Sequence, residues 1–547
     1  MQPEPRAAPR SVSAERCASI DIYDTTLRDG TQREGISLSC EDKLRIACRL
    51  DELGVAFIEG GWPGSNPKDV EFFERAREMK WRHARIAAFG ATRRVEVAAE
   101  DDPGLRALVD ARTEVVTLFG KSSPLHVQDV LRTTRATNLR IIEESVAFLR
   151  AAGRRVIYDA EHFFDGCRED IEYALETLRA AIRGGAEVVV LCDTNGGSMP
   201  WDVAEIVPRV RELGHPFGVH THNDAECAVA NALIAVRGGA THVQGTINGY
   251  GERCGNANLC ALIPNLELKE GLRCLPPGAL RHLSDVARFV AEVANLNADD
   301  HMAYVGRSAF AHKGGVHVHA VRRDARTYQH VDPSAVGNES RIVVSELAGK
   351  ATVVGKAEEF GLALGDGAES RILARIKHGE SLGLAYEAAE ASVALLVKRE
   401  DPSYRPPFEL IDYKVIVGNA PLGAVSEAVV KLRVGEMVLH TAAEGNGPVS
   451  ALDAALRKAL APVYPEIERI HLVDYKVRII DGEDGTSAGV RVLIDSSDGG
   501  QRRWSTVGAS RNIIAASWQA LAESFEYGLD ALKRRGAQAE QSQQEVA

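Results

Sequence analysis

One rhythm, repeated through the first half of the chain, constrains the fold more than any other feature. Between Ile20 and about Leu266, short apolar and β-branched runs alternate with glycine-rich or polar turns and with helical stretches. Eight such runs occur, among them IDIYD, RVIYDAE and EVVVLCD. Eight strands alternating with helices predict an α/β fold, a (β/α)₈ or TIM barrel. An open doubly wound sheet is disfavoured, because the first run leads into DTTLRDGTQ where a nucleotide-binding sheet has GxGxxG.

The rest of the chain divides at proline-rich breaks. Residues 1–19 are rich in Pro, Ala and Arg without an apolar core, which predicts a disordered tail before a catalytic barrel at 20–275. Pro276 and Pro277 open a mostly helical stretch, and we expect residues 276–400 to form a helical linker subdomain that completes the active site. After DPSYRPP, residues 401–535 form a further predicted domain, and 536–547 a polar tail.

The last domain contains an internal repeat. LIDYKV at Leu410–Val415 recurs as LVDYKV at Leu472–Val477, and each copy precedes further strands and a helix. Two copies predict a small α+β domain built from two βββα units. Dimerisation alone would explain such a domain, but a regulatory small-molecule site between the copies is the favoured interpretation.

Composition excludes several functions. The chain has 65 Lys and Arg against 77 Asp and Glu, a formal net charge of −12, which disfavours binding to nucleic acids or anionic membranes. No apolar run reaches the length of about 18 residues that a membrane span needs. The nine cysteines form no CxxC pair, which favours a reducing, cytoplasmic location over a disulfide framework.

Polar residues gather where the predicted strands end. In a barrel of this type the carboxyl ends of the strands carry the active site. Because buried charges cost several kcal/mol unless they are paired, their convergence on one rim predicts a shared ligand. The residues at these ends are Arg28, Asp29, Glu161, Asp193, Thr194, His220, His222 and Asn256.

His220 and His222 suggest a metal site. They are separated by one residue on a strand, so both imidazoles face the same side, about 6.6 Å apart at the Cα atoms. Together with the Asp29 carboxylate and the Asn256 amide oxygen, they form a mixed oxygen and nitrogen set. Such a set suits an octahedral ion with open positions, such as Mg²⁺, Mn²⁺, Fe²⁺ or Zn²⁺. Open positions imply that a substrate chelates the metal.

Three motifs carry a family resemblance. YDTTLRDGTQ, HTHND and GERCGNAN resemble the signatures of the 2-isopropylmalate, homocitrate and citramalate synthase family, whose barrels resemble HMG-CoA lyase. The resemblance covers nearly the whole chain, since AEGNGPVSAL is similar to the C-terminal regulatory domain of this family. EGGWPGSNPKD and TYQHVDPSAVGNESR resemble the citramalate branch. Isopropylmalate synthases typically have His-Gln-Asp where this chain has His317–His319.

The resemblance implies roles for individual residues. Asp29, His220, His222 and Asn256 would ligate a divalent metal ion, with Mg²⁺ or Mn²⁺ expected before Zn²⁺. Arg28 would hold the keto oxygen of a 2-oxo acid, a role that suits a permanently charged, fork-shaped donor. The remaining implied contacts are Glu161, Thr194 and, more weakly, Gln32 with the oxo acid, and His317 and Tyr328 with acetyl-CoA. The choice of the base among His312, His317 and His319 stays open.

The implied reaction is a Claisen condensation of acetyl-CoA with pyruvate, followed by thioester hydrolysis, for isoleucine biosynthesis. The same resemblance implies a homodimer and feedback inhibition by isoleucine. Two alternatives remain: a 2-isopropylmalate or homocitrate synthase with another oxo acid, and an inactive amino-acid sensor on the same scaffold. The intact set of predicted ligands argues against the sensor.

Overall fold

A computed structural model describes residues 19–345, 348–362, 364–420, 423–480, 485, 487–499 and 502–546. The described residues form two compact units. The first takes the described parts of Met1–Phe310 and Val331–Glu339, and the second those of Ala311–His330 and Ser340–Ala547. Apart from Ser19, the predicted tail at 1–19 lies outside the described residues.

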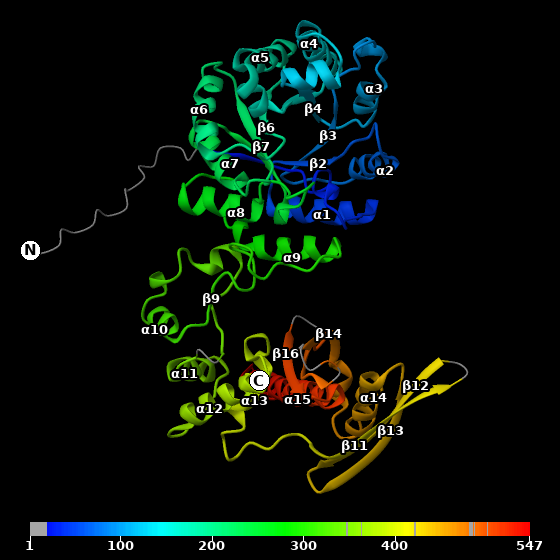
Figure 1. The fold of residues 1–547 in the computed structure, drawn as a ribbon, viewed down its shortest axis with the longest axis vertical. Coiled ribbons are helices and arrows are strands. Elements are labelled where there is room, and N and C mark those ends of the chain that lie inside the picture. Colours follow the sequence, from blue (N-terminus) through cyan, green and yellow to red (C-terminus); the bar gives the residue numbers. More distant parts are fainter. Residues whose placement is uncertain are drawn as a thin grey trace, which may run out of the picture. The chain divides into compact units, whose positions relative to one another are not determined.

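Eight parallel strands of the first unit close into a barrel in chain order (Figure 1). They are β1 (Asp21–Asp24), β2 (Phe57–Gly61), β3 (Arg85–Ala91), β4 (Val115–Lys121), β5 (Arg155–Glu161), β6 (Val188–Asp193), β7 (Phe217–Thr221) and β8 (His242–Gly245). Strand β1 pairs with both β2 and β8, which closes the ring. The barrel predicted from the eight apolar runs is confirmed.

A ring of helices surrounds the strands (Figure 1). The helices are α1 (Cys40–Leu53), α2 (Pro67–Ala76), α3 (Pro103–Asp110), α4 (Arg135–Ala151), α5 (Phe163–Gly184), α6 (Pro200–Arg211), α7 (Ala228–Arg237) and α8 (Leu259–Pro264). Local sequence sets where they begin. Ser39 and Asp42 form a capping box before α1, and proline occupies the first turn of α2, α3 and α6.

The strands are buried on both faces, which explains their continuous apolar sequence. Inside the barrel, Tyr23, Phe57 and Ile157 belong to one hydrophobic cluster. On the outside, residues such as Ile58 and Leu118 belong to a larger core shared with the surrounding helices. The barrel interior is therefore packed, and ligand chemistry is confined to the polar rim at the carboxyl ends.

Helices dominate the chain after the barrel, as the sequence predicts for 276–400. Helix α9 (Leu283–Val293) lies in the first unit. The second unit begins with β9 (Ala311–His312), which pairs with β10 (Arg341–Ile342), and the helices of this part of the chain lie between and after the two strands. These are α10 (Gly315–Arg323), α11 (Lys350–Glu359), α12 (Ala368–Ser381) and α13 (Glu390–Lys398).

The repeated sequence forms two βββα units, as predicted. The first copy contains β11 (Glu409–Ala420), β12 (Gly423–Val434), β13 (Met437–Gly445) and α14 (Pro448–Leu460). The second contains β14 (His471–Ile479), β15 (Val490–Ser497), β16 (Arg503–Ser510) and α15 (Ile513–Val546). The pairing register shifts at Leu410/Asp412 in one copy and at Leu472/Asp474 in the other, so the duplication extends to an irregularity at the same place in the motif.

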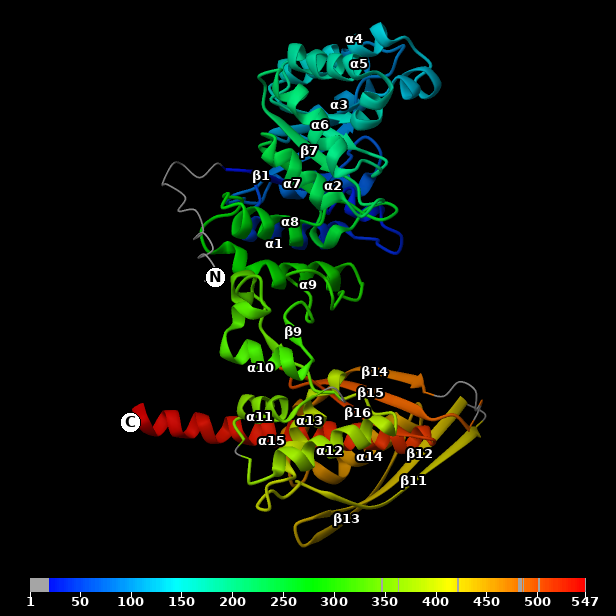
Figure 2. The same ribbon diagram turned by 60° about the vertical axis from the view of Figure 1, so that its left-hand side comes forward.

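The two sheets lie on either side of a helical layer that contains α14 and α15 (Figure 2). Residues of both copies, among them Leu432, Leu456 and Phe525, share one hydrophobic cluster. Helix α15 continues through 536–546, the range for which the sequence predicts a polar tail.

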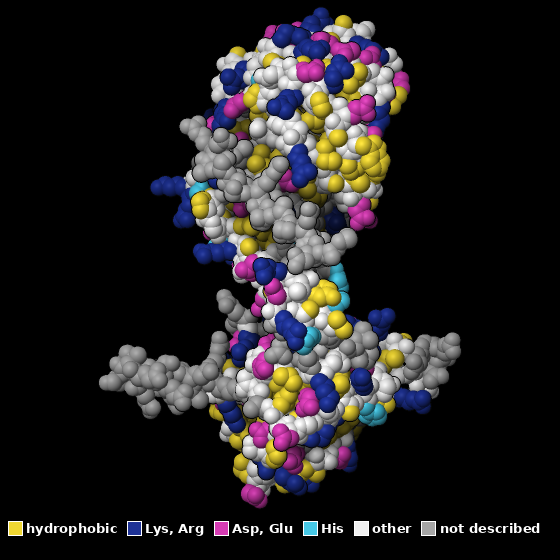
Figure 3. Space-filling model, turned by 90° about the vertical axis from the view of Figure 1, so that its left-hand side faces the viewer, with side chains coloured by type: hydrophobic (Ala, Val, Ile, Leu, Met, Phe, Trp, Pro, Cys, Tyr) yellow, Lys and Arg dark blue, Asp and Glu magenta, His cyan; other side chains and the backbone are white. Residues whose placement is uncertain are grey.

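Surface charge is mixed. On the face drawn in Figure 3, Lys and Arg side chains are interspersed with Asp and Glu. Among the described residues, no helix is both long enough and apolar enough to cross a membrane.

Candidate active site

The predicted rim residues come from five neighbouring parts of the barrel. Arg28 and Asp29 lie in the turn after β1, Glu161 ends β5, and Thr194 follows β6. His220 lies in β7 and His222 directly beyond it. Asn256 lies after β8, and an isolated bridge between its backbone and that of His222 holds the two loops together.

Asp29, His220 and His222 form a buried group whose ligand atoms converge. The two imidazole Nε2 atoms are 3.2 Å apart. Asp29 Oδ2 lies 3.4 Å from Nε2 of His220 and 3.8 Å from Nε2 of His222. Two ring nitrogens and a carboxylate oxygen that face one another in this way fit a single divalent cation.

Unsatisfied polar atoms support the same interpretation. Asp29 Oδ1 and Asn256 Oδ1 are buried and have no hydrogen-bond partner. The Asn256 amide nitrogen donates to the backbone oxygen of Tyr250 at 3.2 Å, which leaves the amide oxygen for another ligand. Because buried acceptors without partners are rare, an oxygen-seeking cation explains both atoms.

Electrostatics favours a cation beside Asp29. Burial alone would raise the pKa of this carboxyl, but Arg28 and His220 outweigh it and hold the pKa well below its usual range. Burial likewise opposes charge on His220, yet Asp29 raises the pKa of that imidazole. Burial beside His220 lowers the pKa of His222 to about 4, so this ring is a neutral ligand near pH 7.

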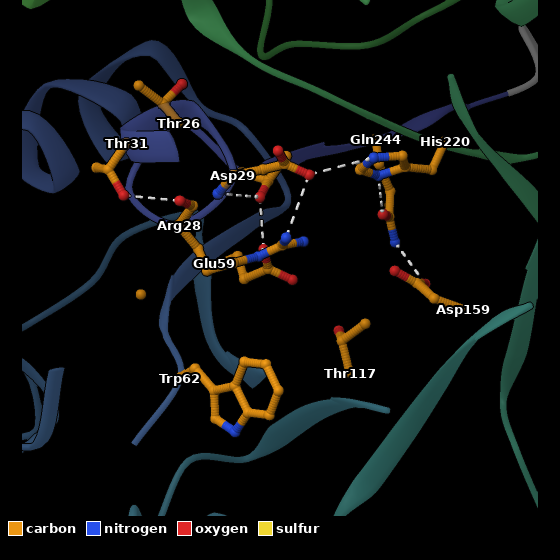
Figure 4. A network of polar contacts seen from close by, with 12 residues as sticks. Thr26, Arg28, Asp29, Thr31, Glu59, Trp62, Thr117, Asp159, His220 and Gln244 are labelled. Carbon is orange, nitrogen blue, oxygen red and sulfur yellow. Dashed lines mark hydrogen bonds and ion pairs between the residues drawn. The ribbon is translucent and has the colours of Figure 1, made fainter. Parts of the chain in front are cut away.

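Arg28 is fixed by a carboxylate that the sequence analysis missed. Its Nε donates to Glu59 Oε2 at 2.6 Å and its Nη1 to Asp29 Oδ2 at 3.1 Å (Figure 4). Glu59 is fully buried and also accepts hydrogen bonds from Tyr23 and Thr25. The guanidinium lies over the Phe89 ring, 3.8 Å from its centre. A cation held on three sides is preorganised for an anionic ligand.

A cavity of about 210 Å³ opens beside these residues. It brings together the predicted residues Arg28, Asp29, Gln32, Glu161, Thr194, His220 and His222. It also contains residues that the sequence analysis did not single out: Trp62, Phe89, Phe119, Asp159, Cys192, Glu252 and Arg253. Phe89 and Phe119 stack with ring centres 5.1 Å apart, and Trp62 meets both rings edge on.

Glu161 and Thr194 are held by their own neighbours. Glu161 forms an ion pair with Lys121 at the end of β4. The Thr194 hydroxyl accepts a hydrogen bond from the backbone N–H of His162 at 2.8 Å. Asp193 accepts hydrogen bonds from the backbone and hydroxyl of Ser198, so it fixes the loop after β6 and is not among the residues that line the cavity.

The residues predicted to act at acetyl-CoA lie in the second unit. His317 and Tyr328 are both exposed, and their ring centres are 4.2 Å apart. His319 is exposed as well. His312 is buried, and burial together with His317 lowers the pKa of its imidazole.

Comparison with protein families divides the chain into three matched segments. The HMGL-like model matches residues 19–290. A homocitrate synthase post-HMGL domain-like model matches 304–382, and the LeuA allosteric (dimerisation) domain matches 387–529.

Curated relatives match over nearly the full length. The (R)-citramalate synthase of Synechocystis sp. is 54% identical over 532 residues, covering 94% of this chain and 97% of its own. That of Geobacter sulfurreducens is 51% identical, covering 93% of this chain and 97% of its own. The 2-isopropylmalate synthase of Methanocaldococcus jannaschii is 31% identical, with coverage of 92% and 94%.

Proposed function

Because the chain belongs to the family of (R)-citramalate synthases, we propose that it condenses acetyl-CoA with pyruvate and hydrolyses the thioester, giving citramalate and CoA. The observation that carries the proposal is the buried group of Asp29, His220 and His222, beside Arg28 in one small cavity. This arrangement suits an acyltransferase that activates a carbonyl for attack. We place the reaction in isoleucine biosynthesis, as the family resemblance implies.

The aromatic lining of the cavity supports pyruvate as the oxo acid. Trp62, Phe89 and Phe119 form an apolar wall of stacked and edge-on rings, which suits the methyl group of pyruvate. Besides Arg28, the cation in this wall is Arg253, whose guanidinium is already paired with Asp224, which disfavours the second carboxylate of 2-oxoglutarate. The substrate of homocitrate synthases therefore fits this wall less well.

We propose that Asp29, His220, His222 and Asn256 hold a divalent cation, Mg²⁺ or Mn²⁺ before Zn²⁺. When bound, such a cation polarises the keto carbonyl of the oxo acid. The mixed oxygen and nitrogen donors of this set differ from the thiolates of a closed structural zinc site.

The protein's own residues supply the remaining chemistry. The guanidinium of Arg28, immobilised by Glu59, donates to the keto oxygen and stabilises negative charge that develops there. Glu161, Thr194 and Gln32 contact the oxo acid and orient it. His317, with Tyr328 beside it, acts at acetyl-CoA, where a base must remove a methyl proton. Of the alternatives, the buried His312 is less suited than His317 to meet a large substrate.

We propose a homodimer formed through the C-terminal domain and inhibited by isoleucine. Eleven of the twenty exposed large hydrophobic side chains among the described residues lie on its two sheets. So many exposed apolar side chains on two sheets are typical of a surface that binds another protein. The two sheets carry Leu410, Ile411, Ile416, Val417, Val425, Met437, Val438, Leu472, Val473, Val477 and Ile479.

Metal removal tests the proposal. CoA release from acetyl-CoA with pyruvate should disappear after chelation and return with added Mg²⁺ or Mn²⁺, with citramalate as the product. Undiminished activity in the metal-stripped protein would contradict the metal role. Release of CoA without citramalate would contradict the proposed reaction.

A further inference from the structure

Gln244 is a fully enclosed amide that the proposed chemistry does not use. It lies on β8, is 1% exposed, and is the register partner of His220 on β7. Its side-chain oxygen Oε1 lies 2.7 Å from Nδ1 of His220 (Figure 4). The amide therefore meets the ring nitrogen of His220 that faces away from Asp29.

Two further contacts fix the orientation of this amide. Its nitrogen Nε2 donates to Asp159 Oδ1 on β5 at 3.0 Å, and lies 3.5 Å from Nε2 of His242. Because Asp159 accepts the hydrogen bond from the NH₂ group, that group faces Asp159 and the amide oxygen faces His220.

This orientation determines the tautomer of His220. An amide oxygen only accepts, so Nδ1 of His220 must carry the proton that it shares with Gln244. The neutral ring then keeps its lone pair on Nε2, the nitrogen that points toward Asp29 and His222. We propose that Asp159 and Gln244 are positioning residues that hold His220 in the metal-binding tautomer and orientation. The inference rests on the metal site in the proposed function.

The neighbouring His222 lacks such support. Its Nδ1 is buried and has no hydrogen-bond partner in the described part of the chain. The two imidazoles are therefore not equivalent. His220 is oriented from behind before the cation arrives, whereas the orientation of His222 depends on Asn256 through the backbone and on the cation itself.

Mn²⁺ binding to the metal-free full-length protein, measured by calorimetry without substrates, tests the proposal. Partners behind metal-bound histidines contribute about 10- to 100-fold to metal affinity. Gln244→Leu should therefore weaken Mn²⁺ binding by that factor. As a matched control, Asn231→Leu removes another buried amide of the barrel, one that donates to the backbone oxygen of Ser198. It should leave the Mn²⁺ affinity unchanged.

Exchanging the amide and the carboxylate between positions 244 and 159 tests whether the hydrogen bond, and not only the packing, supports His220. Gln244→Glu places a carboxylate against Asp159 and should weaken Mn²⁺ binding. Adding Asp159→Asn restores a donor opposite an acceptor, and the double variant should recover an affinity close to that of the unaltered protein. The proposal is overturned if Gln244→Leu binds Mn²⁺ normally, if Asn231→Leu weakens binding equally, or if the double variant shows no recovery. Absence of Mn²⁺ binding in the unaltered protein would instead contradict the proposed metal site.

Discussion

At the barrel rim, charged side chains are buried against one another, whereas on the two C-terminal sheets apolar side chains face solvent. Asp29 and Glu59 are almost or completely inaccessible, while Ile416 and Val417 are 59% and 63% exposed. Each region departs from the usual partition of polar and apolar groups. The rim fits the proposed divalent cation, and the sheets fit the proposed dimer contact.

The largest effect on turnover should follow from replacing one of the proposed metal ligands at the barrel rim. His220→Ala removes one of three converging ligands, and polarisation of the carbonyl is worth several kcal/mol. Turnover with pyruvate should fall by about three orders of magnitude. Size-exclusion chromatography should give the same oligomeric state as for the unaltered protein. Activity within a few-fold of normal would contradict the role of this group.

Removing the carboxylate that holds Arg28 should destabilise the barrel. Glu59→Leu leaves a buried guanidinium with only Asp29 beside it, and breaking such a pair costs about 3–5 kcal/mol of unfolding free energy. Urea denaturation measures the loss. Glu41→Leu, which removes the exposed partner of Arg75, is the control and should change stability little. Equal stability of the two variants would show that Glu59 is not needed to balance Arg28.

A smaller effect is expected on the selectivity between pyruvate and larger oxo acids. Phe119→Ala enlarges the cavity where Phe119 stacks on Phe89, and each added methylene that fits is worth roughly 1–3 kcal/mol. The kcat/KM ratio of 2-oxoisovalerate to pyruvate should rise by about tenfold or more. Phe72→Ala removes a buried ring that does not line the cavity, and it should leave the ratio unchanged. An unchanged ratio in Phe119→Ala would contradict a role of the aromatic side chains in selecting the oxo acid.

The smallest effect on turnover should follow from substitutions on the two C-terminal sheets. Val417→Lys puts a charge on an exposed apolar strand and should weaken the proposed dimer, with kcat per chain retained. Light scattering across a dilution series measures the dimer. Glu409→Lys, at the exposed end of β11, is the control. Thr441 lies on the same sheet but is unsuitable, because its hydroxyl donates to the backbone oxygen of Ala455. Equal dimer stability for Val417→Lys and Glu409→Lys would contradict a dimer contact through the apolar residues of this sheet.

Much of the fold could be predicted from the sequence. Strands that are buried on both faces have nearly continuous apolar sequences, and capping residues mark where helices begin. The alternation of strands and helices in the barrel can therefore be predicted from local sequence. The rim residues could be found because they interrupt or end such runs. The duplicated domain was visible in LIDYKV and LVDYKV.

The partners of those rim residues could not be predicted. Glu59, Asp159 and Gln244 are polar residues inside largely buried barrel strands, and the side chains that they contact depend on which strands become neighbours. Gln244 meets His220 because β7 and β8 pair in one register, and meets Asp159 across the barrel, 85 residues away in the chain. A polar residue inside an otherwise apolar strand was the signal available, but it does not identify the partner.

Competition among oxo acids tests the central claim most directly. We expect kcat/KM for CoA release from acetyl-CoA to be highest with pyruvate and at least about tenfold lower with 2-oxoisovalerate and 2-oxoglutarate, a factor that corresponds to about 1.4 kcal/mol of transition-state binding. A higher kcat/KM with either larger acid would contradict the proposed function.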